Sequence, residues 1–162
     1  MYEHVLVPID IQHRSSWERA LPAAVQAARE SGARLHVLTV VPDMFAGVDW
    51  RYAIRGEQHG SIDYDRTELM RQARDRLQEL VGEHVPASVD TEVLVRHGTI
   101  YEEILEAADE VAADLIVMAS HRPSLKDYLI GPNAARVVRH ARCSVQVVRN
   151  PPPPGSDAGP PS

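Results

Sequence analysis

Five short apolar runs, each followed by a polar or helix-like stretch, constrain the fold of this 162-residue chain more than any other feature. Short runs rich in β-branched residues are typical of strands buried on both faces. They lie at 4–9, 35–41, 91–96, 115–119 and 144–149. Strands that alternate with helices pair in parallel through right-handed crossovers. We therefore expect an α/β fold with a single doubly wound five-stranded parallel sheet and helices on both faces.

The first helix has clear boundary signals. Ser15 and Glu18 form a capping-box pattern that predicts its start, and Gly32 predicts its end. Pro22 lies inside the pattern and removes one backbone hydrogen bond, so it predicts a kink or a late effective start.

Three further helices are predicted from apolar residues at helical spacing. They are expected at 66–81, 100–111 and 131–141. Gly82 is predicted to stop the first of these. Between the second strand and this helix, residues 42–65 show no period and predict a long irregular excursion, which could cover the ligand site as a lid.

Length and composition predict one domain, at 1–150. The Pro-rich tail at 151–162 has little to bury and is expected to be disordered and partly polyproline-like. It could be a ligand for a proline-recognising domain or an unconstrained terminus. The net charge of −6 argues against nucleic acid as a partner.

A cytoplasmic protein without membrane insertion is expected. No apolar run reaches the length of a membrane span, and the chain start lacks the layout of a signal peptide. The single cysteine, Cys143, cannot form an internal disulfide and is interpreted as a small core residue. The eight histidines are scattered without metal-ligand spacing, so no metal site on protein ligands is predicted.

The loops that follow the first and fourth strands are the predicted site. In open parallel sheets, ligands bind at the carboxyl ends of strands where the winding changes direction. The helix that opens at Gly131 adds free N–H groups that suit a phosphate. These loops offer Pro8, Ile9, Asp10, Ala119, Ser120, His121, Arg122, Gly131, Pro132 and Asn133 as candidate site residues.

Several motifs resemble those of universal stress proteins over roughly residues 1 to 149, excluding much of 43–65. They are Val-Pro-Ile-Asp at 7–10, Val-Leu-Thr-Val-Val-Pro at 37–42, His-Gly at 97–98, Asp-Leu-Ile-Val-Met-Ala-Ser-His-Arg-Pro at 114–123 and the stretch 131–149. The Ser-His-Arg-Pro motif is similar to that of an ATP-binding branch of the family. The resemblance implies a Rossmann-like sheet of the adenine nucleotide alpha hydrolase-like type.

The resemblance also implies a ligand and its neighbours. Asp10 and Val40 would line an adenosine pocket, and a glycine-rich segment would hold ribose and phosphates. The nucleotide-binding residues expected from the loops and the resemblance together are Pro8, Ile9, Asp10, Val40, Met118, Ala119, Ser120, His121, Arg122, Gly131, Pro132, Asn133 and Ala134. Here Ala119, Arg122 and Pro132 replace the family's glycines and hydroxyl, so whether ATP is retained is the main question. Arginine could supply charge to a phosphate, and AMP could bind with less help from this turn. ATP or AMP is the expected ligand, with Mg²⁺ as an optional companion.

Individual site residues have alternative roles. Asp10 could cap its own loop, as aspartate commonly does. His121 could equally be a loop histidine or a ligand contact. Met118 is expected to pack in the core while its edge touches adenine. Pro132 suits the first turn of a helix on structural grounds alone.

The leading hypothesis is a regulatory stress protein that binds an adenine nucleotide. The alternative is a nucleotide-independent dimeric interaction module that regulates an unidentified partner protein. No Gly-x-Ser-x-Gly elbow, P-loop or nucleophile–base pair is present, so no catalytic residue is predicted. Slow ATP hydrolysis, autophosphorylation or nucleotidyl transfer stays open through the resemblance. The last strand, 144–149, would lie at a sheet edge and predicts a homodimer.

Overall fold

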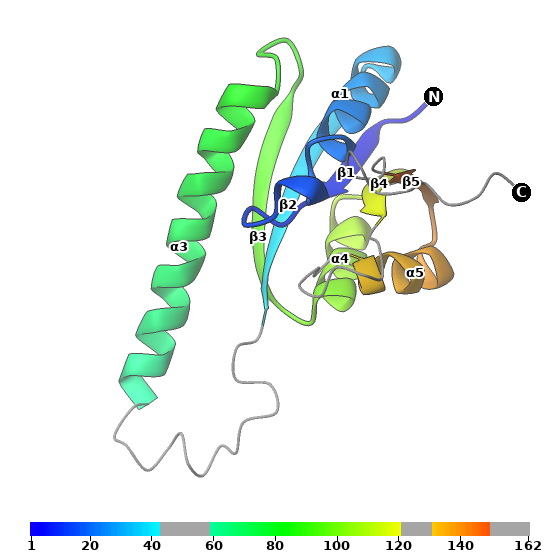
Figure 1. The fold of residues 1–162 in the computed structure, drawn as a ribbon. Coiled ribbons are helices and arrows are strands. Elements are labelled where there is room, and N and C mark those ends of the chain that lie inside the picture. Colours follow the sequence, from blue (N-terminus) through cyan, green and yellow to red (C-terminus); the bar gives the residue numbers. More distant parts are fainter. Residues whose placement is uncertain (43–58, 121–130, 150–162) are drawn as a thin grey trace, which may run out of the picture.

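The computed structural model describes residues 1–42, 59–120 and 131–149. Its core is one parallel sheet, which confirms the predicted fold class (Figure 1). The order in the sheet is β3-β2-β1-β4-β5, and every described pair of neighbouring strands is parallel. The strands are β1 (His4–Pro8), β2 (Arg34–Pro42), β3 (Thr91–Gly98), β4 (Leu115–Ser120) and β5 (Ser144–Arg149).

Helices cover both faces of the sheet. A 3-10 helix, η1 (Arg14–Ser16), precedes four helices, α1 (Ala20–Ser31), α3 (His59–His84), α4 (Ile100–Glu110) and α5 (Gly131–His140). Helices α1 and α3 pack on one face through Leu21 and Leu77, in a cluster with Val5 and Val37. Helices α4 and α5 pack on the other face, where Ile104 joins the strand residues that point that way. Side chains alternate between faces along each strand, so each strand feeds both clusters.

The start of α1 differs from its prediction. The capping-box prediction is wrong, because the helix begins at Ala20 and its N-cap residue, Arg19, makes no side-chain capping bond. Pro22 lies in the first turn, where backbone N–H groups make no hydrogen bond within the helix, so its missing N–H costs none. The predicted late start of the helix is confirmed. Gly32 ends the helix with a φ of 68°, as expected.

Helix α3 is longer than predicted at both ends. It begins at His59, so the prediction of an irregular excursion is wrong for 59–65, while 43–58 lies outside the described residues. It also continues through Gly82 to His84, because a helix tolerates glycine at modest cost. Pro86 follows, and the residue before a proline disfavours helical backbone, which accounts for the end. In the described part of the chain, no helix has both the length and the apolar character of a membrane span.

Gly98, at the end of β3, has a conformation that other residues avoid. Its φ is 145°, and an added Cβ would lie 2.8 Å from Oε2 of Glu103. The turn from β3 into α4 therefore depends on this glycine.

Gly98→Ala is expected to lower the free energy of unfolding by about 1–3 kcal/mol, the cost of such backbone strain. Urea unfolding would measure the change. Gly82→Ala is the matched control, because a Cβ on Gly82 in α3 meets nothing within 4 Å. The control is expected to raise stability by up to about 1 kcal/mol. An equal effect of both substitutions would contradict this account of Gly98.

Candidate functional site

The winding of the sheet changes direction between β1 and β4. These two strands are neighbours, but from β1 the chain proceeds outward to β2 and from β4 it proceeds outward to β5 (Figure 1). In open parallel sheets the loops at such a point part to opposite faces, so a ligand crevice is expected between the ends of β1 and β4. The described site residues lie at or just after the carboxyl ends of β1, β2 and β4, or in the first turn of α5. The topology therefore brings these segments to one edge of the sheet.

Asp10 follows β1 and has a fixed, buried carboxylate. The residue is 8% exposed. Its Oδ1 accepts a hydrogen bond from the backbone N–H of Gln12 at 3.0 Å, and its Oδ2 lies 2.8 Å from Nδ1 of His13. The contact with Gln12 is the loop-capping role considered as an alternative for Asp10. Each oxygen keeps a further lone pair, so these contacts leave room for a ligand donor.

Ser16 organises the backbone of the same loop. Its Oγ accepts a hydrogen bond from the Asp10 N–H at 2.8 Å and lies 2.8 and 2.7 Å from the carbonyl oxygens of Asp10 and His13. The side chain is 2% exposed. The sequence interpretation assigned the start of this helix to a serine cap and missed the role of Ser16 in the loop.

Strand β2 supports the end of β1. The N–H of Ile9 donates to the carbonyl of Leu38 at 2.8 Å, and Thr39 Oγ1 donates to the Ile9 carbonyl at 2.9 Å. Pro8 and Ile9 are buried, so the backbone at the end of β1 is held in place. Val40 is half-buried one residue beyond Thr39 and packs on the cluster beneath α4.

The end of β4 carries the second group of predicted site residues. Met118 is fully buried and belongs to the cluster under α4 and α5, as its predicted core role requires. Ala119 is 4% exposed, while Ser120 is half-buried at the last position of the strand. His121 and Arg122 lie outside the described residues.

Helix α5 opens at Gly131, where the sequence predicted it. Pro132 is exposed in its first turn, which agrees with the structural role considered for it. Ala134 is 7% exposed and packs in the core. The side chains that contribute to the crevice from this helix are therefore few.

Asn133 links the starts of two helices. Its Oδ1 accepts a hydrogen bond from the Tyr101 N–H at 3.1 Å, in the first turn of α4. The N-cap residue of α4, Thr99, makes no side-chain capping bond, so Asn133 supplies the cap from a distant part of the sequence. This contact was missed by the sequence interpretation, which treated Asn133 only as a ligand residue.

Arg96 lies beside Val40 in the sheet and is held by three carboxylates. It contacts Glu103 at 2.8 Å, Glu106 at 3.0 Å and Glu110 at 2.7 Å, all on α4. The hydrogen bond with Glu103 is the main cause that raises the pKa of Arg96 above its usual value. This guanidinium therefore fastens α4 to β3 and is a poor candidate for binding phosphate.

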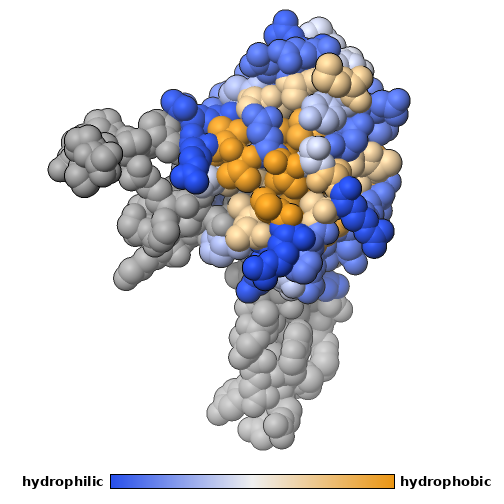
Figure 2. All heavy atoms as spheres, turned by 90° about the vertical axis from the view of Figure 1, so that its right-hand side faces the viewer, coloured by the Kyte–Doolittle hydropathy of each residue, from blue (hydrophilic) through white to orange (hydrophobic). Residues whose placement is uncertain are grey.

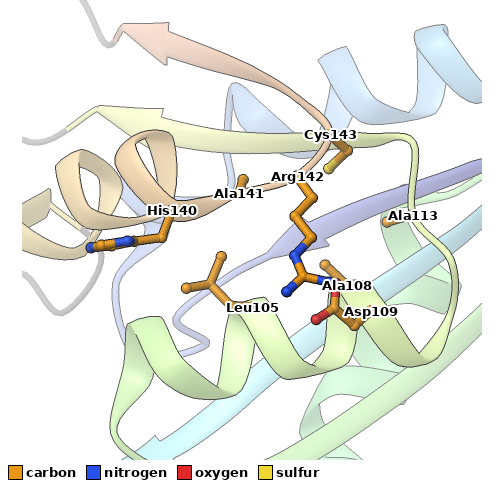
Figure 3. A pocket seen from close by; sticks show the side chains of 8 residues that line it. All are labelled: Leu105, Ala108, Asp109, Ala113, His140, Ala141, Arg142 and Cys143. Carbon is orange, nitrogen blue, oxygen red and sulfur yellow. The ribbon is translucent and has the colours of Figure 1, made fainter.

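A small cavity of about 80 Å³ lies at the opposite end of the strands, beside the start of β5. Figure 3 shows Arg142 reaching towards Asp109 across it, with Cys143 at its rim. The pKa of the Cys143 thiol is raised, mainly by burial and to a lesser extent by the charges of Asp114 and Asp109. Thiolate chemistry is therefore disfavoured. Within the described ranges, no three His, Cys, Asp or Glu side chains converge to hold a metal ion.

Comparison with known proteins identifies related chains. The universal stress protein family matches residues 1–149. Universal stress protein G of Shigella flexneri is 32% identical over 152 residues, covering 92% of this chain and all of the relative. The structure of hypothetical protein MJ0577 has a TM-score of 0.72 at 21% identity, covering 94% of this chain and 99% of that one. A universal stress protein in complex with cAMP has a TM-score of 0.57 at 29% identity, covering 91% and 97%.

Proposed function

This chain belongs to the universal stress protein family, and we propose that it is a regulatory protein that binds an adenine nucleotide in the crevice between β1 and β4. The observation that carries the proposal is the buried, doubly hydrogen-bonded carboxylate of Asp10 at the point where the winding reverses. A buried charge with free lone pairs at a ligand edge is a good candidate for recognition. The cAMP complex of a relative at 29% identity supports an adenine nucleotide as the ligand.

The chemistry of the crevice assigns an orientation to the nucleotide. A carboxylate accepts hydrogen bonds and repels phosphate, so Asp10 meets the adenine amino group or the ribose hydroxyls. Val40 offers an apolar side chain to the base. The phosphates of ATP or AMP then extend towards the opening turn of α5, whose N–H groups and partial positive charge favour anions. Mg²⁺ accompanies the phosphates of ATP in this proposal.

Calorimetry on nucleotide-free protein tests the proposed ligand. Titration with ATP, ADP and AMP, with and without Mg²⁺, is expected to show saturable binding of at least one of them. GTP is the control for base recognition and is expected to bind more weakly. Absence of binding by all three adenine nucleotides at millimolar concentration would refute the proposal.

A nucleotide-independent interaction module is the second candidate. Helix α5 presents Pro132 rather than a hydroxyl at its first turn, which weakens the case for phosphate binding. The edge strand β5 favours assembly, because among the described strands only β4 pairs with it and its other side is left open. Figure 2 shows apolar side chains gathered on the face of the molecule where β5 and α5 lie. Val138 of α5 and Val147 of β5 are exposed. We infer a homodimer through Ser144–Arg149, in the cytoplasm, that acts on a protein partner.

Val147→Lys is expected to convert the dimer into a monomer, because two charged side chains would meet across the new interface. Light scattering at micromolar concentration would measure the mass. Leu69→Lys is the control, since Leu69 is a similarly exposed apolar residue on α3, 37% against 39% for Val147. A wild-type protein that is already monomeric would contradict the inferred dimer.

A further inference from the structure

We propose that His13 is a positioning residue for the nucleotide, because its imidazole holds the Asp10 carboxylate in the orientation that meets the nucleoside. The inference rests on the proposed nucleotide site. Its starting point is the 2.8 Å contact between Nδ1 of His13 and Oδ2 of Asp10. A carboxylate oxygen accepts hydrogen bonds, so Nδ1 carries the proton in this contact and the imidazole is the donor.

The carboxylate has one described protein donor for each oxygen. The Gln12 N–H serves Oδ1, and His13 serves Oδ2. Two donors on different oxygens fix the plane of the carboxylate, whereas one donor leaves it free to turn about the bond to Cβ. The Asp10 side chain is only 9% exposed, so little water reaches its carboxylate, whereas the His13 side chain is 32% exposed.

The backbone of the loop does not depend on the imidazole. The His13 N–H donates to the Asp10 carbonyl at 3.0 Å, and the His13 carbonyl accepts from the Ser16 N–H at 2.9 Å. Ser16 Oγ adds its own contacts with the Asp10 backbone. A substitution at position 13 keeps all of these backbone bonds, so it changes the orientation of the Asp10 side chain without removing the loop.

A group held in its binding orientation costs less to order when the ligand arrives. The orientation of ligand-binding groups by a neighbouring hydrogen-bond partner is commonly worth tenfold or more in affinity. His13 is therefore expected to contribute to affinity without touching the nucleotide. The effect should be the same for adenosine, AMP and ATP, because Asp10 meets the nucleoside part that these ligands share.

The experiment compares His13→Leu with His13→Asn in the full-length protein. Leucine removes the donor, whereas asparagine places an amide N–H near the position of Nδ1. Calorimetry is expected to show about tenfold weaker binding of adenosine, AMP and ATP to the leucine variant, and near-wild-type binding to the asparagine variant. Thermal melts give the unfolding temperature of each variant, and binding is measured well below that temperature so that every variant is folded.

A double-mutant cycle with Asp10→Asn separates positioning from other effects. If His13 acts through the carboxylate, the penalty of His13→Leu should disappear in the Asp10→Asn background. An unchanged penalty in that background, or wild-type affinity of the leucine variant, would overturn the inference while leaving the proposed function intact. A wild-type protein that binds no adenine nucleotide would overturn both.

Discussion

Asp10→Ala is expected to weaken the binding of adenine nucleotides by about a hundredfold, or about 2.7 kcal/mol. The substitution removes a nine-tenths buried charged acceptor that the proposed site uses to bind the nucleoside. It also removes the loop contacts with the Gln12 N–H and with His13, so the residual site is less ordered. Calorimetry with ATP and AMP on nucleotide-free protein would measure the loss.

A matched control separates this effect from a general change of charge. Asp75→Ala makes the same substitution on α3, where the Asp75 side chain is 61% exposed and paired with Arg71. This variant is expected to bind nucleotide as the wild type does, because exposed ion pairs contribute little to stability. If Asp10→Ala also binds as the wild type does, the nucleotide does not use the carboxylate and the proposed site is wrong.

The Asp10→Ala variant also distinguishes the two candidate functions in cells. If Asp10→Ala loses both nucleotide binding and a stress-survival phenotype, the nucleotide is part of the function and the interaction module is rejected. If binding is lost but the phenotype persists, the nucleotide is dispensable and the module is favoured. The Val147→Lys variant then reports whether the phenotype instead follows the dimer.

The sheet could be predicted from the sequence because each strand is marked locally. A run such as Leu115–Ser120 is apolar on both faces and ends at a polar residue, so its length and burial follow from its own composition. The edge of the sheet that carries the candidate site could be predicted for the same reason, since ligands bind at the carboxyl ends of parallel strands, whereas the strand order that sets the reversal between β1 and β4 comes from the structure. The residues assigned to that site stay predictions, with His121 and Arg122 outside the described part of the chain.

The differences from prediction arise where distant residues compete with local signals. Ser16 resembles part of a helix start, but its hydroxyl lies against the backbone of Asp10, six residues earlier. Asn133 resembles a phosphate contact, but its amide oxygen caps α4 by accepting from Tyr101, 32 residues before it in the sequence. Neither contact leaves a pattern in the sequence, because a single polar residue satisfies many hydrogen-bonding arrangements equally well.

A second large effect is expected from a buried histidine that no functional hypothesis uses. His36 of β2 is 2% exposed and lies between His4 of β1 and Glu92 of β3. Its Nε2 is 3.0 Å from Nδ1 of His4, and its Nδ1 is 2.5 Å from Oε1 of Glu92. The pKa of His36 is lowered, and burial is the main cause. Glu92 raises this pKa in part, whereas His4 and Arg34 lower it further.

This lowered pKa makes the stability of the protein depend on pH in a defined direction. The unfolded chain binds a proton at His36 as the pH falls through about 6.5, whereas the folded protein binds it only at a lower pH. The stabilising contribution is therefore complete above about pH 6.5 and is lost as the pH falls towards the pKa of the folded state. Each unit of lowering corresponds to about 1.4 kcal/mol of stability.

His36→Leu is expected to remove this dependence. At pH 8 the variant should be less stable than the wild type by about 1–3 kcal/mol, because His4 and Glu92 lose a buried hydrogen-bond partner. As the pH falls from 7 to 5 the deficit should narrow, because only the wild type bears the cost of a buried imidazolium. Urea unfolding at each pH would measure it. Leu38→Ala is the control, because Leu38 is fully buried on the same strand and its loss of stability should stay constant with pH. If the loss of stability of His36→Leu also stays constant with pH, His36 does not govern acid stability.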